Sequence, residues 1–97
     1  MDSSSAKNRL RLGLFVQPVG HHVSGWRLTE ELGAPTDIDW LIRLAQKAEA
    51  GRFDLFFVGD ALATSMYRLP STMARLEPLT MLSAVAVNTR RIGLAAT

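Results

Sequence analysis

The stretch Phe53–Asp60 constrains the fold more than any other part of this 97-residue sequence. Its centre, Leu55–Val58, consists of four consecutive large apolar residues and runs directly into Gly59 and Asp60. A strand of this composition has no polar face, which predicts that both of its faces are covered, as in a parallel sheet between helices. Asp60 then lies at the carboxyl end of that strand, where parallel α/β folds bind their ligands.

Strand and helix patterns alternate on both sides of this stretch. The apolar run Leu12–Val16 predicts a first strand, and residues 36–50 carry apolar side chains at helical spacing. Glu77 and Pro78 open a second helix, because proline is well tolerated in the first turn, and Ile92–Thr97 predicts a third strand. The order strand, helix, strand, helix, strand predicts an α/β fold with parallel strands and intervening helices.

The loops have unequal lengths, which points to one architecture. Residues 18–36 and 61–76 form long connections after strands, whereas the connections from helix to strand are short. In TIM (β/α)8 barrels the long loops gather at the carboxyl ends of the strands, where the chemistry takes place. We therefore expect the N-terminal three-strand β/α portion of such a barrel.

The expected organisation is a polar tail at residues 1–9 followed by a partial β/α-barrel domain at residues 10–97. A complete barrel needs about 250 residues, so the sequence is expected to be the N-terminal portion of a larger protein. Three strands alone leave an apolar sheet edge exposed, which favours association with other chains.

Two local signals predict where the first helix begins and ends. Thr36 followed by Asp39 resembles a capping box with a shorter acid, and Asp37 adds negative charge at the helix N-terminus. Gly51 is placed to end the helix as the first residue beyond its C-cap.

Composition excludes several classes of protein. The sequence has no cysteine, which excludes a disulfide framework and thiolate metal sites. Its net charge of +2 comes from scattered arginines rather than a basic stripe, so no nucleic-acid partner is expected. Apolar runs are too short to span a membrane, and the polar leader is unlike a secretory signal, so the expected compartment is the cytoplasm.

Candidate site residues lie at the strand ends and in the first long loop. Asp60 has two interpretations, a ligand contact at the carboxyl end of its strand and an N-cap of the following turn. His21 and His22 are adjacent and point in different directions, so no metal site is expected and a solvated or substrate-facing loop is the alternative. Trp26 has two interpretations, a side chain that covers a bound cofactor or substrate and a side chain packed for burial.

Four segments resemble the bacterial-luciferase-like, flavin-dependent monooxygenases, in particular the nitrilotriacetate monooxygenase group. Together they extend the resemblance over residues 10–97. The segments are Gly20–Arg27, Ala50–Asp60, Leu76–Leu79 and Thr89–Thr97.

The resemblance implies a β/α barrel that uses reduced FMN and dioxygen to oxidise a small organic substrate. It implies a separate flavin reductase as the donor of reduced FMN, and a homo-oligomer for the full-length protein. It assigns Asp60 and Thr97 as flavin contacts, while the catalytic residues stay unknown. For His21, His22 and Trp26 the expected place is a substrate-side loop. A flavin carries the oxygen chemistry itself, so strand-end side chains need only to position it.

Two alternatives remain open at this point. The chain could be a non-catalytic fragment or assembly piece, inactive alone, that folds against partner chains through its sheet edge. It could also belong to a different β/α-barrel enzyme, because a fold does not determine a chemistry.

Overall fold

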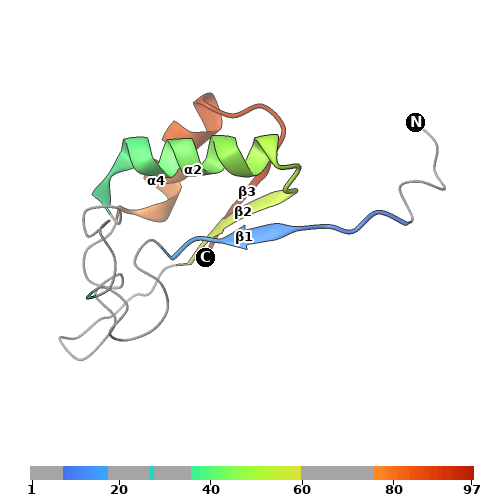
Figure 1. Cartoon of the computed structure of the whole chain (residues 1–97). Coiled ribbons are helices and arrows are strands. Elements are labelled where there is room, and N and C mark those ends of the chain that lie inside the picture. The colour runs from blue at the N-terminus through green and yellow to red at the C-terminus, as the bar shows by residue number, and fades with distance from the viewer. Residues whose placement is uncertain (1–7, 18–26, 28–35, 60–75) are drawn as a thin grey trace.

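Three parallel strands and two helices make up the part of the chain that the computed structural model describes, residues 8–17, 27, 36–59 and 76–97. The strands form one sheet in the order β1–β2–β3, and both strand pairs are parallel (Figure 1). The expected alternation and the parallel order are confirmed. In chain order the elements are β1 (Gly13–Phe15), α2 (Ile38–Ala50), β2 (Leu55–Val58), α4 (Pro78–Val87) and β3 (Gly93–Ala96).

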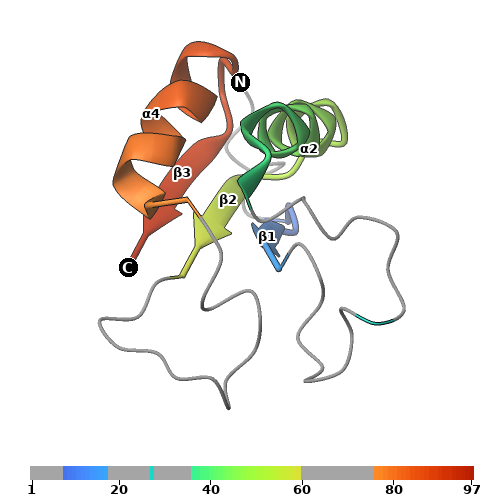
Figure 2. The same ribbon diagram turned by 90° about the vertical axis from the view of Figure 1, so that its left-hand side faces the viewer.

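Both helices pack on the same face of the sheet, as the two views of the ribbon show (Figures 1 and 2). Crossovers of one hand that proceed in one direction across a parallel sheet place successive helices on the same side. The core lies between the sheet and the helices. Its buried residues are Val16, Leu41, Ala45, Ala48, Phe56, Val58, Met81, Leu82, Val85 and Ile92.

The other side of the sheet, which we call the open face, differs from the sequence-based expectation. Along β2, Phe56 is fully buried and Val58 is 8% exposed, whereas Leu55 is 38% exposed and Phe57 is half-buried. Side chains alternate between the two faces of a strand, so Leu55 and Phe57 lie on the open face. Within the described residues, β2 is therefore covered on one face rather than on both, because both helices lie on one side.

The helix α2 begins one residue later than the capping-box pattern suggests. Its N-cap is Asp37, whose Oδ1 accepts a hydrogen bond from the backbone N–H of Trp40 at 3.1 Å. The expected role of Thr36 is therefore wrong, because an N-cap side chain must reach the second or third N–H of the helix and Thr36 lies one position too early. The apolar stripe is confirmed, with Leu41, Ala45 and Ala48 buried.

The C-terminus of α2 also differs from the expectation. Gly51 is the C-cap with φ −80°, and the following residue, Arg52, takes the left-handed conformation with φ 68°. The Arg52 N–H donates to the Glu49 carbonyl at 3.1 Å, and the Phe53 N–H donates to the Ala48 carbonyl at 3.0 Å. These two bonds define a Schellman motif, in which glycine usually occupies the position that Arg52 holds here.

Replacing Arg52 with glycine is expected to raise the free energy of unfolding by about 1 kcal/mol, because glycine adopts positive φ without steric strain. Urea denaturation followed by circular dichroism measures the change. The matched control is Arg52→Ala, which removes the side chain and keeps the strained backbone, and which should leave the stability close to that of the original chain. An equal gain in both variants would show that the side chain, and not the backbone, causes the strain.

The start of α4 follows the sequence-based expectation. Pro78 is the first helical residue, and Glu77 is the N-cap, accepting hydrogen bonds from the N–H groups of Leu79 at 3.0 Å and Thr80 at 2.7 Å.

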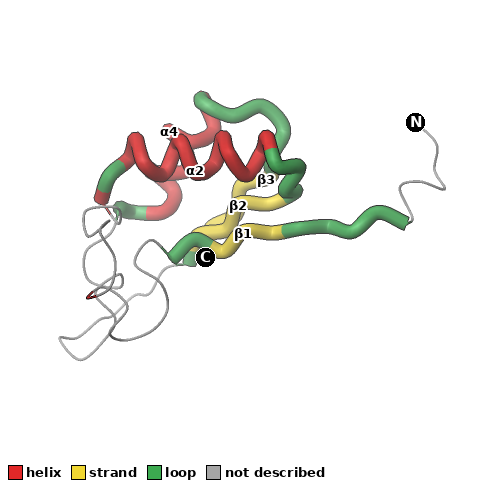
Figure 3. Tube along the Cα trace, viewed as in Figure 1, coloured by secondary structure: helices red, strands yellow, loops and turns green. Residues whose placement is uncertain are grey.

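The connections from helix to strand, residues 51–54 and 88–92, lie together at the end of the sheet where β2 and β3 begin (Figure 3). We call this the amino end of the sheet, and the opposite one the carboxyl end.

Candidate functional site

The three strands finish together at the carboxyl end of the sheet, near the C-terminus in Figure 1. The hydrogen-bond ladder continues just past the strands, because the Val16 N–H donates to the Phe57 carbonyl at 3.0 Å and the Thr97 N–H donates to the Val58 carbonyl at 3.2 Å. Extending the strand register by these bonds sets three residues side by side at this end. They are Gln17 after β1, Gly59 after β2 and Thr97 after β3.

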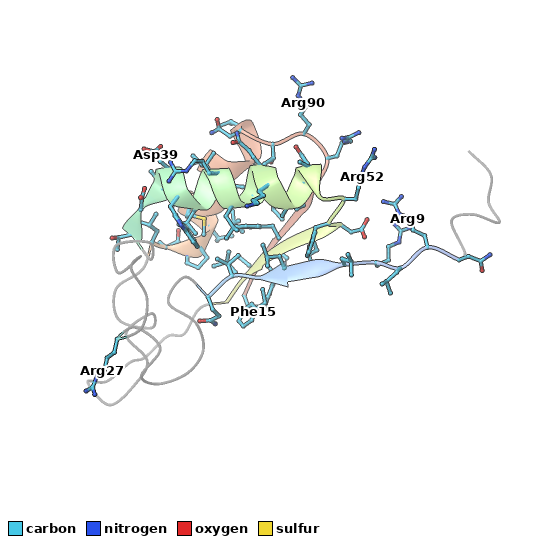
Figure 4. All side chains as sticks on the ribbon, in the orientation of Figure 1. Arg9, Phe15, Arg27, Asp39, Arg52 and Arg90 are labelled. Carbon is cyan, nitrogen blue, oxygen red and sulfur yellow. The ribbon has the colours of Figure 1, made fainter. Side chains whose placement is uncertain are left out.

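An apolar row lies next to these three residues, on the open face. Phe15 pairs with Phe57 across β1 and β2, and Phe57 pairs with Ala95 across β2 and β3. The Phe15 and Phe57 ring centroids are 5.0 Å apart with the planes tilted by 33°. Phe15 is 49% exposed, and Figure 4 shows it on the side of the sheet away from the helices. The open face at the carboxyl end is therefore aromatic.

Gly59 lies directly beside the Phe15 ring. A Cβ atom added to Gly59 would lie 3.3 Å from Cε2 and 3.4 Å from Cζ of Phe15, closer than ordinary van der Waals contact. The missing side chain therefore leaves room for the Phe15 ring beside the end of β2. Alternation along the strands places Gln17, Gly59 and Thr97 on the same open face as the ring.

Of the predicted site residues, Thr97 lies in the described part of the chain. It is exposed at the carboxyl end, next to β3, where its hydroxyl group can serve as a hydrogen-bond donor or acceptor. Asp60, His21, His22 and Trp26 lie outside the described residues, so their assignments stay predictions.

The two helix N-termini at this end of the sheet are already occupied by carboxylates of the chain itself. Asp37 accepts from the first turn of α2, and Glu77 accepts from the first turn of α4. The hydroxyl and N–H groups of Thr80, followed by the Leu79 N–H, hold the pKa of Glu77 below its ordinary value. Because a carboxylate of the chain already caps each terminus, both termini are less suited to bind a ligand phosphate.

A different group of charges stabilises the amino end of the sheet. Oε2 of Glu49 accepts hydrogen bonds from three consecutive backbone N–H groups, those of Arg90 at 2.8 Å, Arg91 at 2.6 Å and Ile92 at 2.9 Å. These bonds lower the pKa of Glu49 to about 2. They tie the end of α2 to the connection that enters β3, which is a structural role far from the carboxyl end.

Asp54 has a similar role beside β1. Its Oδ2 accepts from the Leu12 N–H at 3.0 Å, and its Oδ1 lies 3.4 Å from an Arg11 nitrogen and 3.5 Å from an Arg9 nitrogen. The hydrogen bond from the Leu12 N–H is the main cause of the lowered Asp54 pKa.

Arg9 and Arg52 also lie at the amino end of the sheet, as Figure 4 shows. A cavity of about 300 Å³ opens between them, lined also by Glu49, Phe53, Asp54, Arg91 and Ile92.

Metal and membrane sites receive no support from the described residues. Among them, no group of three or more His, Cys, Asp or Glu side chains is arranged to hold a metal ion. No helix in the same part of the chain combines the length and the apolar character needed to cross a bilayer.

Sequence reasoning did not identify Phe15, Gln17 or Gly59 as part of the site. The signal that could have found them is positional, because each lies at the carboxyl end of a predicted parallel strand, as Asp60 and Thr97 do. Which of these residues share the open face depends on strand register, which the sequence alone does not provide. Together the described residues place an exposed aromatic side chain and a hydroxyl group on the same face at the carboxyl end of the sheet.

Comparison with known proteins identifies the family of the chain. The profile of the luciferase-like monooxygenase family matches residues 19–97. N-acetyl-S-(2-succino)cysteine monooxygenase of Bacillus subtilis is 40% identical over 98 residues, which cover 97% of this chain and 22% of that protein. Nitrilotriacetate monooxygenase component A of Aminobacter aminovorans is 31% identical, over 95% of this chain and 23% of its own length.

A third relative, a subunit of the pristinamycin IIA synthase of Streptomyces pristinaespiralis, is 33% identical over 94% of this chain and 23% of its own length. The chain thus spans less than a quarter of the length of the curated relatives that it matches.

Proposed function

The chain belongs to the luciferase-like monooxygenase family, and from this premise we propose that it forms part of the active site of a flavin-dependent monooxygenase. The observation that supports the proposal most strongly is the exposed aromatic side chain of Phe15 at the carboxyl end of the sheet, on the same face as Gly59 and Thr97. Ligands of parallel β/α proteins bind at this end of the strands.

The proposed cofactor is FMN in its reduced form, which supplies the reaction with dioxygen when bound. Thr97 would hold the flavin by a hydrogen bond from a rigid strand end, and Asp60 would do the same from the end of β2. The apolar row of Phe15, Phe57 and Ala95 would exclude water from that part of the site. The described residues would bind the cofactor and exclude water, and the cofactor would carry the oxygen chemistry. No acid–base pair is therefore needed among them.

The remaining parts of the proposal concern the whole protein. The three strands would be the first three of a TIM barrel, with the open face turned to the barrel interior, where facing strands would cover Leu55 and Phe57. The substrate would be a small organic molecule, reached by His21, His22 and Trp26 of the loop at residues 18–36. Two relatives are named as one part of an enzyme with several parts, which supports a separate flavin reductase as partner, and we also expect a homo-oligomer in the cytoplasm.

Anaerobic titration of the chain with reduced FMN, followed by isothermal calorimetry, tests the proposal. Saturable binding with one flavin per chain is the expected result. If the heat of dilution is all that is seen up to high micromolar flavin, flavin binding by this chain is excluded.

The same titration tests the role of Thr97. Valine has nearly the same shape as threonine, so replacing Thr97 with valine removes the hydroxyl group and little else. We expect flavin to bind about 2- to 10-fold more weakly, as for the loss of one hydrogen bond. The matched control is Thr89→Val, at the amino end, where the hydroxyl donates to the Val85 carbonyl at 3.0 Å. Equal affinities for the two variants would contradict the assignment of Thr97.

A further inference from the structure

Three arginine side chains line one cavity at the amino end of the sheet, the end opposite the proposed flavin site. They are Arg9 ahead of β1, Arg52 between α2 and β2, and Arg91 between α4 and β3. The cavity has a volume of about 300 Å³, which is at the lower end of the range for small-molecule sites. Phe53 and Ile92 give it apolar walls, and such walls strengthen the field of the charges beside them.

The two acids of the cavity are held by the backbone of the chain itself. Oε2 of Glu49 accepts hydrogen bonds from the N–H groups of residues 90–92, and Oδ2 of Asp54 accepts one from the Leu12 N–H at 3.0 Å. These bonds, together with the charges of nearby arginines, lower the pKa values of both acids, so both are ionised at neutral pH. The three arginines of the lining still outnumber the two carboxylates.

The ion pairs of the described residues leave two of these arginines without a carboxylate. Both pairs involve Asp54, whose Oδ1 lies 3.5 Å from an Arg9 nitrogen and 3.4 Å from an Arg11 nitrogen. No acid of the described part of the chain forms an ion pair with the guanidinium group of Arg52 or Arg91. A bound anion would supply the acceptors that these two side chains need.

Arg52 occupies a backbone position that favours glycine. Its φ of 68° is left-handed, whereas the adjacent Gly51, which could adopt that conformation without strain, has a φ of −80°. A strained backbone at a residue other than glycine is often found where the side chain has a function. What the arginine adds at this position is a guanidinium group on the wall of the cavity.

From these observations we propose that the cavity binds the phosphate group of a small molecule, with Arg52 and Arg91 as its main contacts. A phosphate group has at least three acceptor oxygens and up to two negative charges, and a guanidinium group can donate two parallel N–H groups to it. The ligand would contact both helix-to-strand connections and so would stabilise the amino end of the sheet. The proposal concerns the end opposite the flavin and does not rest on the proposed function.

NMR titrations of the isotope-labelled chain at constant ionic strength test the proposal. The probe is inorganic phosphate at slightly alkaline pH, where it is mostly a dianion. The amide signals of Arg52, Asp54 and Ile92 should shift together and give one dissociation constant, whereas those of Phe15 and Thr97 at the carboxyl end should not move. Methyl phosphate is the second probe. Tighter binding than inorganic phosphate identifies a phosphate ester as the ligand, and equal or weaker binding identifies the free ion.

Three variants show whether the cavity itself holds the phosphate. Arg52→Gln and Arg91→Gln should each weaken phosphate binding about tenfold, because each removes a charged donor. The matched control is Arg90→Gln, which removes the same charge from a residue that does not line the cavity and that points away from the sheet in Figure 4. It should change the dissociation constant by less than about twofold, because salt screens exposed charges outside the cavity.

Three outcomes overturn the proposal. If sodium chloride alone, at the same ionic strength, moves the same signals to the same extent, phosphate acts by screening and not by binding. If Arg90→Gln weakens binding as much as Arg52→Gln, net charge and not the cavity attracts the ion. If succinate, a dicarboxylate, binds as tightly as phosphate, the cavity does not recognise a phosphate group. All of these measurements are made without flavin, so their failure leaves the proposed function untouched.

Discussion

Replacing Phe56 with alanine is expected to lower the free energy of unfolding by about 3–5 kcal/mol, which is the largest stability effect that we expect from any single substitution in this chain. Phe56 is fully buried at the centre of β2, between its register partners Leu14 and Leu94 and beneath the helices. Small domains are stable by only about 5–15 kcal/mol, so such a loss leaves little or no folded protein. Urea denaturation followed by circular dichroism measures it.

The matched control is the neighbouring residue Phe57, which has the same side chain on the opposite face of the same strand. Phe57 is half-buried on the open face, and its truncation to alanine removes less buried area, so we expect less than half of the loss seen at Phe56. Similar losses at the two positions would contradict a core that lies on one side of the sheet.

The same pair of residues shows what the sequence can and cannot predict about the fold. Four apolar residues in a row predict the strand at Leu55–Val58 and its place in a parallel sheet, and both are confirmed. They do not distinguish the helix-covered face from the open one, because the difference depends on where the helices cross rather than on β2 itself. Alternating polarity, the usual signal for a half-exposed strand, is absent from this segment.

Helix ends show a second limit of the sequence. The Glu77-Pro78 start of α4 was predictable because proline restricts the possibilities to the first turn. The C-terminus of α2 was not, because Gly51 and Arg52 are adjacent and the strained conformation falls on the arginine. The exact residue at which a helix ends depends on where the next strand lies in the fold. Local helix propensity carries no information about that position.

The candidate site was predictable in part. Thr97 is found exposed at the carboxyl end of the sheet, which is the position that the resemblance implies, although its contact with flavin stays a prediction. The contribution of Phe15 and Gly59 depends on a contact between residues that are distant in sequence, which composition and spacing do not encode. Glu49 was missed for the same reason, because its partners lie 41–43 residues further along the chain.

Acidification is expected to destabilise the chain as the pH falls from about 4.5 towards 2, and Glu49 should account for a large part of this loss. Its folded-state pKa is about 2, below the ordinary value of 4.5, because three backbone N–H groups donate to the ionised carboxylate. A group with a lowered folded-state pKa stabilises the protein above its unfolded-state pKa, and that contribution is lost as the pH falls through the folded-state pKa. The pKa values of Asp54 and Glu77 are also lowered, so both change the stability in the same direction.

The variant Glu49→Gln separates this residue from the other two acids. An amide cannot replace the carboxylate charge that the N–H groups of Arg90, Arg91 and Ile92 share, so we expect a lower melting temperature at neutral pH, by several degrees. The variant should also lose less stability than the original chain between about pH 4.5 and 2, because its amide does not titrate.

The matched control for this variant is Asp39→Asn, an exposed acid in the first turn of α2. It removes the same charge from the same helix, at the end far from the N–H groups that Glu49 binds, and so controls for the loss of a negative charge on α2. Melting temperatures measured by circular dichroism from neutral pH to about pH 2 compare the three proteins. If Glu49→Gln and Asp39→Asn show the same pH dependence as the original chain, the link between α2 and the entry to β3 does not depend on the Glu49 charge. If only Glu49→Gln flattens the profile, the charge on Glu49 stabilises the connection between α2 and β3 at the amino end of the sheet.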